Sequence, residues 1–301
     1  MTNVWDPTKV IQIDTVIQIL NEQFPNILIK SIEQIGEGFD NTVFILNEEI
    51  LLRYPRREVA VSILKTEKKL LPFLKDYISF QTTIPFLFGQ PSEKFNWPFL
   101  GYNFIKGKPP IRLNRQERIN MIEPLANILK QLHSIPLSIL SHLNLPGDEL
   151  KRLDIKYRKP QLLKYVEEAI KLNLIPDKMK IKQYIENLQV GVPKTPLVLV
   201  HGDLHVKNMI VNDEHRLEGI IDWGDAHIGQ RELDLSIVFS IIPSDKRESF
   251  YEMYGQISNE SKLLAQFKSI YTTVILLLYA KEYDDEDLVQ FCQENLTNAL
   301  S

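Results

Sequence analysis

Three polar residues in the second half of the chain have the types and spacing needed to bind a divalent cation and orient a hydroxyl group. Asp203 and Asn208 lie five residues apart, and Asp222 follows beyond a short apolar segment. Carboxylate and amide oxygens suit Mg²⁺, and in phosphoryl transfer one carboxylate orients the attacking hydroxyl while such oxygens hold metal against nucleotide phosphates. The pattern therefore predicts a phosphoryl-transfer site, with Asp203 as the catalytic residue and Asn208 and Asp222 as metal ligands.

Two apolar segments must position these residues. Residues 196–200 directly precede the first motif, and residues 217–221 directly precede Asp222. Both segments are predicted to be buried strands. Because a rigid strand fixes the backbone at its end, polar groups on the loops that follow can converge on one cleft.

The two motifs, at 201–208 and 221–225, resemble the catalytic and metal-binding loops of the aminoglycoside phosphotransferase and choline-kinase-like family. The resemblance implies an α+β, bilobal, protein-kinase-like fold with a small N-lobe, built from an antiparallel sheet and a helix, and a larger, mainly helical C-lobe. It also implies Mg²⁺-dependent transfer of the γ-phosphate of ATP or GTP to a hydroxyl of a small molecule. An aminoglycoside-type antibiotic is the leading acceptor, which would make this a resistance enzyme, and a metabolic hydroxyl compound such as choline, a sugar or an amino-acid-like metabolite is the alternative.

The first hundred residues have the pattern of a small kinase N-lobe. A helix is expected from Asp6 and Pro7 up to Pro25 because Pro fits a first helical turn. Strands are predicted at 27–35, 42–46 and 50–54 and an amphipathic helix at 58–74. We assign 1–102 to a nucleotide-binding N-lobe, 103–107 to a hinge, and 108–301 to a C-lobe with the catalytic loop and acceptor-binding helices.

The N-lobe offers candidate nucleotide contacts. By resemblance, Arg53 on the third strand pairs with Glu67 on the following helix and contacts the phosphates. The family often has Lys at this position, and the planar guanidinium differs from a point-like ammonium. Gly36 and Gly38 could let backbone N–H groups cover phosphates, although a plain hairpin turn explains the same glycines.

The hinge segment is expected to bind the purine. The resemblance implies hydrogen bonds from the backbone of Asn103, Phe104 and Ile105, and Ile221 is assigned to the same nucleotide site. A plain edge strand is the alternative for residues 97–107.

Acidic residues near the second motif and near the C-terminus could contact a cationic acceptor. Asp225, Asp284 and Asp285 are the candidates, because clustered carboxylates attract polyamines. Such a run is more often a solvated turn and a helix N-terminus, where acids suit the helix dipole, and Asp225 could instead brace the metal loop.

The remainder is predicted to be mainly helical. Two residues in it match recurrent family positions with structural roles: His133, and Asp234, which would brace the catalytic loop. The predicted helices span 115–132, 161–172, 178–188, 231–242, 248–254 and 263–282.

Composition narrows the class of protein. The chain has 301 residues, 44% of them hydrophobic, and a net charge of −4, which gives no basic footprint for nucleic acid. Cys292 is the only cysteine, so no disulfide framework is expected. The apolar run 274–280 is far shorter than the roughly 20 residues that span a bilayer. We therefore expect a cytoplasmic monomer that binds a nucleoside triphosphate and a small acceptor, and neither nucleic acid nor a membrane.

Two other classes of function stay open on the sequence. His201, Asp203 and His205 alternate along one loop and could be ligands of a metal-dependent hydrolase. A nucleotide-binding pseudokinase is the other alternative, which Arg53 and Gln230 keep open while the intact Asp203, Asn208 and Asp222 argue against it.

Overall fold

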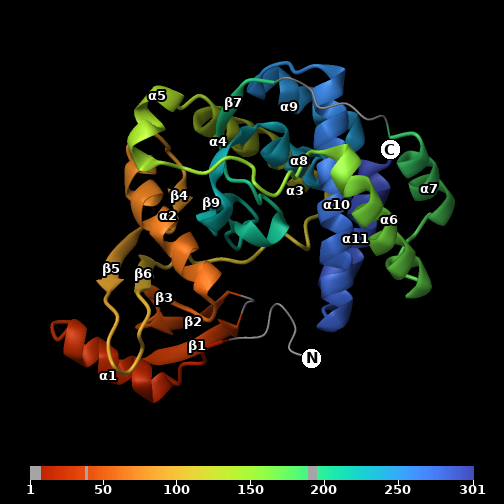
Figure 1. The fold of residues 1–301 in the computed structure, drawn as a ribbon. Coiled ribbons are helices and arrows are strands. Elements are labelled where there is room, and N and C mark those ends of the chain that lie inside the picture. The colour runs from red at the N-terminus through yellow and green to blue at the C-terminus, as the bar shows by residue number, and fades with distance from the viewer. Residues whose placement is uncertain (1–7, 38–39, 189–194) are drawn as a thin grey trace. The chain divides into compact units, whose positions relative to one another are not determined.

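The computed structural model describes residues 8–37, 40–188 and 195–301. The chain divides into two compact units. Unit 1 comprises Met1–Tyr77, Gln81–Lys106 and Asp222–Gly224. Unit 2 comprises Ile78–Phe80, Gly107–Ile221 and Asp225–Ser301. The predicted α+β class is confirmed, with a small antiparallel sheet in unit 1 and a larger, mainly helical unit 2 (Figure 1).

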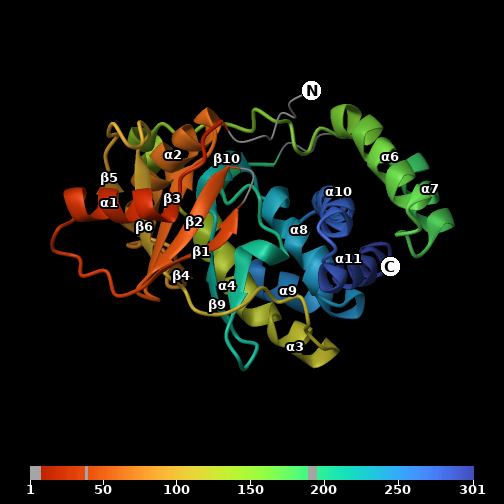
Figure 2. The ribbon, with the colours of Figure 1, turned by 90° about the horizontal axis from the view of Figure 1, so that it is seen from below.

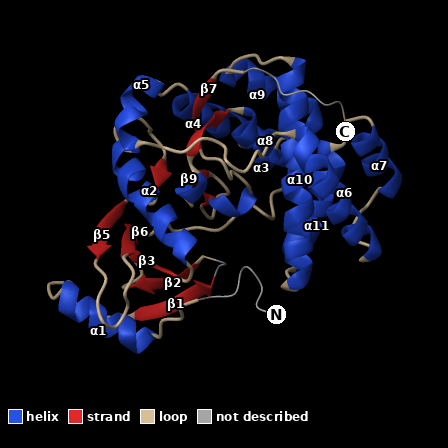
Figure 3. Ribbon diagram, viewed as in Figure 1, coloured by secondary structure: helices blue, strands red, loops and turns tan. Residues whose placement is uncertain are grey.

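Unit 1 is built on a five-stranded antiparallel sheet in the order β1-β2-β3-β6-β5. Figure 3 shows these strands in red between two helices. The elements of unit 1 are α1 (Ile13–Gln23), β1 (Ile32–Glu37), β2 (Asn41–Leu46), β3 (Ile50–Pro55), α2 (Glu58–Leu74), β4 (Gln81–Thr82), β5 (Pro85–Gly89) and β6 (Phe99–Asn103).

The alternation of side chains along β3 decides what each face of the sheet carries. Leu52 and Tyr54 are fully buried in the apolar core that includes Val16 and Leu20 of α1. Successive residues of a strand point to opposite faces, so Arg53 points to the other face, where it meets α2. One strand thus supplies both the core and a charged site.

Two predicted boundaries in unit 1 are wrong. The helix near the N-terminus begins only at Ile13, because the backbone N–H groups of Thr8 and Lys9 donate to the Arg56 carbonyl oxygen and are not available to a helix. Asp6 and Pro7 lie outside the described residues. The first strand begins only at Ile32. The Asn47 side chain forms hydrogen bonds with backbone groups of residues 28, 30 and 31, so these groups are not available for strand pairing.

Unit 2 contains the remaining helices and two pairs of short antiparallel strands. Its elements are α3 (Arg115–Asn120), α4 (Ile122–His133), α5 (Leu137–Leu140), α6 (Ile155–Lys171), α7 (Lys178–Glu186), β7 (Leu197–Val200), β8 (Met209–Val211), β9 (Leu217–Ile220), β10 (His227–Gln230), α8 (Glu232–Ile241), α9 (Arg247–Tyr254), α10 (Asn259–Glu282) and α11 (Glu286–Ala299). Short 3₁₀ turns join several of these elements.

Helix α10 is the central helix of unit 2. It packs against α8, α11 and α6, and Figure 2 shows α8, α10 and α11 side by side. By length and composition it is the one helix in the described residues that could cross a membrane, but 61% of its apolar stretch is buried inside the unit. Its apolar surface is therefore accounted for by core packing.

One predicted helix of unit 2 is two helices. The sequence pattern predicted a single helix over 115–132, whereas α3 ends at Asn120 and α4 begins at Ile122. Pro124 lies in the first turn of α4 and has no N–H for the carbonyl four residues earlier, which belongs to Asn120. The continuous pattern therefore breaks at Met121.

Candidate active site

The loop that carries Asp203 leaves the end of a buried strand through a conformation that only glycine adopts easily. Val200, the last residue of β7, is fully buried. Gly202 has a φ of +84°, and a Cβ there would lie 2.3 Å from the Asp225 carbonyl oxygen. The backbone thus turns sharply just before Asp203, which becomes the first residue that can present a side chain outward.

A buried carboxylate holds this turn from beneath. Asp234 of α8 is fully buried and accepts hydrogen bonds from the backbone N–H groups of His201, at 2.8 Å, and Gly202, at 3.0 Å. His133 lies 3.1 Å from the same carboxylate. Burial by itself would raise the pKa of Asp234, but His133 and the loop outweigh it and lower the pKa. The predicted structural roles of Asp234 and His133 are confirmed.

The Asp203 carboxylate is accessible and lies beside two basic side chains. Its side chain is 39% exposed; His205 Nε2 lies 3.4 Å from one carboxylate oxygen and Lys268 Nζ lies 4.0 Å from the other. Burial alone would raise the pKa of Asp203, but His205 and Lys268 bring the pKa below its ordinary value. An anionic carboxylate of this kind accepts a hydrogen bond from a hydroxyl group but is a weak base, which suits a positioning role.

The side chain of Asn208 is oriented by a hydrogen bond to the backbone of Asp203, five residues earlier in the same loop. Its side chain Nδ2 donates to the Asp203 carbonyl oxygen at 2.9 Å, so that its Oδ1 remains as an acceptor or metal ligand. The backbone N–H of Ile221 donates to the Asn208 carbonyl oxygen at 2.9 Å, and the chain reaches Asp222 one residue later. The β8–β9 hairpin thus connects the two motifs through a direct backbone hydrogen bond.

Asp222 groups with unit 1 and is paired there. Its φ is +63°, and its Oδ1 lies 3.0 Å from Nη2 of Arg53. The side chain is 52% exposed, so a cation or solvent can reach it. A carboxylate oxygen, like the amide oxygen of Asn208, is the type of hard ligand that Mg²⁺ takes, and the metal role of each residue stays a prediction.

The histidines beside Asp203 do not form a metal-binding cluster. Within the ranges that the structure describes, no group of three or more His, Cys, Asp or Glu side chains could hold a metal ion. His205 Nε2 faces Asp203, and His201 Nε2 lies 2.9 Å from the Ile221 carbonyl oxygen. These contacts disfavour the hydrolase alternative.

Arg53 connects two acidic groups in unit 1. Its Nη1 donates to both oxygens of Glu67, at 2.8 and 3.1 Å, while its Nη2 donates to Asp222. Tyr102 donates from its hydroxyl group to Glu67 at 2.5 Å. Burial by itself would lower the pKa of Arg53, but Glu67 and Asp222 raise it. A guanidinium can bond both carboxylates at once, which the single ammonium of a lysine does less well.

The backbone N–H groups of the three predicted hinge residues differ in whether they already donate hydrogen bonds within the fold. The N–H groups of Asn103 and Phe104 donate to the carbonyl oxygens of Ile84 and Glu49, at 3.4 and 2.8 Å. Within the described part of the chain, the Ile105 N–H has no hydrogen-bond acceptor. Of the three N–H groups, that of Ile105 is thus the one that stays available for a purine, and the role of all three residues remains a prediction.

The glycine-bearing turn is only partly described. Gly36 lies in β1, where a register shift interrupts the pairing with β2, and a Cβ at this position would meet no atom within 4 Å. The open space is compatible with an approaching ligand, although it is equally compatible with a strand irregularity. Gly38 lies outside the described residues.

The acidic residues proposed for acceptor binding are engaged within unit 2. Asp225 forms an ion pair with Arg152. Asp285 is the N-cap of α11 and accepts from the Leu288 N–H at 3.0 Å, while Asp284 is nearly fully exposed and lies 3.9 Å from Lys281 Nζ. The helix N-terminus that the sequence offered as an alternative is thus present.

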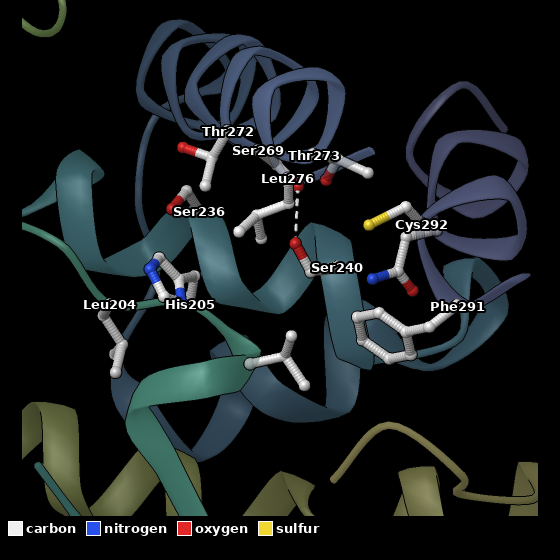
Figure 4. Close-up of a pocket in the computed structure, with 12 residues that line it drawn as sticks. Leu204, His205, Ser236, Ser240, Ser269, Thr272, Thr273, Leu276, Phe291 and Cys292 are labelled. Atoms are coloured by element: carbon white, nitrogen blue, oxygen red, sulfur yellow. Dashed lines mark hydrogen bonds between the residues drawn. The ribbon is translucent and has the colours of Figure 1, made fainter. Parts of the chain in front are cut away.

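Two features of unit 2 were not predicted. Lys268 is the only charged residue between Lys262 and Lys281 of α10, and that pattern is the signal that could have singled it out. Beside the catalytic loop, residues of α8, α10 and α11 line a cavity of about 10 Å³ with both polar and apolar side chains, and His205 belongs to its lining (Figure 4). That volume suits one water molecule rather than an acceptor.

Comparisons with known proteins identify a family that the chain matches. The model of the phosphotransferase enzyme family matches residues 31–265. An aminoglycoside 3'-phosphotransferase from Escherichia coli is 28% identical over 153 residues, which are 49% of this chain and 54% of that relative. The match thus spans about half the length of this relative.

Solved structures show the same fold. The GDP complex of aminoglycoside 2'-phosphotransferase-IIIa superposes with a TM-score of 0.68 at 21% identity, covering 95% of this chain and 97% of that one. Macrolide 2'-phosphotransferase type I gives a TM-score of 0.61 at 16% identity, covering 96% and 99%. These likenesses confirm the predicted protein-kinase-like fold, and the family match covers most of the chain, so the protein belongs to the phosphotransferase enzyme family.

Proposed function

We propose that this protein catalyses Mg²⁺-dependent transfer of the γ-phosphate of ATP or GTP to a hydroxyl group of a small molecule. The observation that carries the proposal is the catalytic loop itself. Asp203 presents an accessible carboxylate from a loop that buried Asp234 braces, and Asn208 is locked by a bond to the same loop. Such fixed positioning is what a loose phosphoryl-transfer transition state requires.

Each residue has a role that follows from its surroundings. Asp203 accepts a hydrogen bond from the acceptor hydroxyl and directs its oxygen at the γ-phosphorus. The bond from that phosphorus to the β–γ bridging oxygen breaks as the new P–O bond forms, and the nucleoside diphosphate leaves with the electron pair. The hydroxyl proton passes to Asp203 late in the transfer and then to solvent.

The nucleotide phosphates need compensating charge. Arg53, oriented by Glu67, would supply one positive group. Asn208 Oδ1 and the Asp222 carboxylate would hold Mg²⁺, which when bound neutralises phosphate charge. Ile105 would donate its free N–H to the purine, with Gly36 and Ile221 as further candidates around the nucleotide.

The acceptor remains a prediction. The relatives carry aminoglycoside and macrolide names, which supports an antibiotic acceptor and a resistance role for a cytoplasmic enzyme. A metabolic hydroxyl compound is the second candidate. The pairing of Asp225 with Arg152 and the position of Lys268 favour it, since carboxylates that a polyamine would need are already engaged.

The proposal is tested by nucleotide consumption with Mg²⁺ and ATP or GTP across aminoglycosides, macrolides, choline and small sugars. An active acceptor should stimulate turnover, and Asp203→Asn should reduce the stimulated rate by about a thousandfold, in the range that one positioned proton-transfer group contributes, while the melting temperature stays unchanged. Stimulation that survives in Asp203→Asn contradicts the assigned role. Nucleotide binding without any stimulated turnover favours the pseudokinase.

A further inference from the structure

Lys268 is a buried cation whose hydrogen-bonding capacity the described part of the protein leaves unused. It is 8% exposed, and within the described residues its ammonium group has no hydrogen-bond acceptor. Its ion pair with Asp203, at 4.0 Å, is longer than a hydrogen bond. Its Nζ does not belong to the fully buried side-chain atoms that lack a partner, so solvent or a ligand can reach it. The ammonium group can therefore donate hydrogen bonds to an oxygen atom that arrives next to Asp203.

The two carboxylates whose charge acts on Lys268, those of Asp203 and Asp225, already have partners within the chain. Asp225 and Asp148 both pair with Arg152, the latter at 2.9 Å. Asp203 has His205 and Lys268 beside it. An ammonium group of an acceptor would therefore be repelled by Lys268, and the carboxylates that could bind it are already paired.

The neighbouring arginine offers no second free cation. Arg158 donates to Gln161 at 2.7 Å and to the Lys151 carbonyl oxygen at 3.3 Å. Its charge nevertheless acts on Lys268, as does that of Arg152. Among the described residues around Asp203, the ammonium group of Lys268 lacks a hydrogen-bond acceptor, whereas Arg152 and Arg158 are both bonded.

From this arrangement we propose that Lys268 is an acceptor-binding residue that selects an oxygen substituent, most strongly a carboxylate, beside the reacting hydroxyl and disfavours an ammonium group there. The inference rests on the proposed phosphotransfer and names the charge of its acceptor. The hydroxyl group bonds to Asp203, and Lys268 donates to the adjacent oxygen. The preferred acceptor is then a polyhydroxy acid or neutral polyol rather than a polyamine.

The test uses three linear six-carbon polyols that differ in the charge of one end group, D-gluconate, D-glucitol and D-glucamine, together with kanamycin as a polycation. Transfer with Mg²⁺ and the preferred nucleotide is measured as kcat and KM for each. We expect kcat/KM to fall in the order gluconate, glucitol, glucamine, with gluconate at least about tenfold better than glucamine, a difference of about 1.4 kcal/mol.

Variants separate acceptor binding from other roles. In Lys268→Met the preference should fall to about threefold or less, mainly through a higher KM for gluconate, since only the charge-dependent contact is removed. Lys268→Arg should keep the order of acceptors. Lys262→Met is the matched control on the same helix, where the ammonium pairs with Glu248 at 2.7 Å, and it should change nothing.

The possible failures are distinguishable. Kanamycin or glucamine as the best acceptor, or a Lys268→Met variant with unaltered preference, overturns the inference and leaves the phosphotransferase standing. An equal loss of kcat for every acceptor without a change in KM assigns Lys268 to the transferring phosphoryl group and also overturns it. No Asp203-dependent transfer to any acceptor overturns the proposed function, and this inference with it.

Discussion

The two units hold their charged groups in different ways. In unit 2, Asp234 is fully buried and binds backbone N–H groups of the catalytic loop. In unit 1, Arg53 binds the buried Glu67 on one side and the half-exposed Asp222 on the other. The first network fixes a backbone, whereas the second has an outer bond that solvent or a phosphate group can replace. The comparison separates a structural brace from an adaptable ligand site.

The largest expected effect comes from breaking the brace. Asp234→Ala removes the acceptor of two backbone N–H groups and leaves His133 beside an apolar side chain. Loss of one partner from a buried charged network typically costs about 3 kcal/mol, so unfolding in urea should shift to a clearly lower midpoint. An Asp234→Ala protein with an unchanged midpoint would show that the loop is held elsewhere.

A matched surface pair provides the control for that experiment. Asp245 forms an exposed ion pair with Arg115 at 2.7 Å. Exposed pairs contribute little because solvent screens them, so Asp245→Ala should leave the urea midpoint unchanged. A shift similar to that of Asp234→Ala would remove the distinction between the two classes of carboxylate.

A smaller effect is expected from changing the adaptable network. Arg53→Lys keeps the charge but cannot reproduce both bonds of the guanidinium fork. Nucleotide affinity measured by calorimetry should weaken by about fivefold, which corresponds to about 1 kcal/mol, the net contribution of one typical hydrogen bond, with little change in the unfolding midpoint. Lys94→Ala, which removes an exposed pair with Glu22 in the same unit, should leave nucleotide binding unchanged. Equal nucleotide affinity of wild type and Arg53→Lys would show that the two-pronged guanidinium group of Arg53 is not needed for nucleotide binding.

The smallest expected effect is a pH dependence of stability. The pKa of Asp234 is lower in the folded protein than the value of about 3.9 that an unfolded Asp has. Its contribution to the free energy of unfolding is therefore complete above that value and is lost as the pH falls toward the folded pKa. Wild type should lose stability more steeply than Asp234→Asn between about pH 4 and pH 3. Parallel slopes would contradict the assignment.

Local patterns predicted those parts of the fold that depend on local chemistry. The predicted helix at 58–74 coincides with α2, because its apolar spacing leaves little choice of face. The start of α1 and of β1 depended instead on Arg56 and Asn47, which lie far away in sequence. Hydrogen bonds of this kind, made to backbone groups by residues distant in sequence, have no signal in a single sequence.

The candidate site likewise contains residues that the sequence could predict and one that it could not. Asp203, Asn208 and Asp222 carry a recognisable spacing, and Asp234 a matching position. Lys268 could not be placed beside Asp203 from spacing, since 65 residues separate them and only the packing of α10 against α8 and the catalytic loop brings them together. The acceptor is correspondingly the least predictable part of the function.

The most direct test of the account is to find where the phosphate goes. Wild type and Asp203→Asn are incubated with Mg²⁺, nucleotide and the acceptor that gives the greatest stimulation, and products are followed by ³¹P NMR. The account predicts a phosphate ester of the acceptor that forms in step with nucleoside diphosphate in wild type and is nearly absent with Asp203→Asn. Inorganic phosphate as the only new product, or an ester formed equally by both proteins, would contradict it.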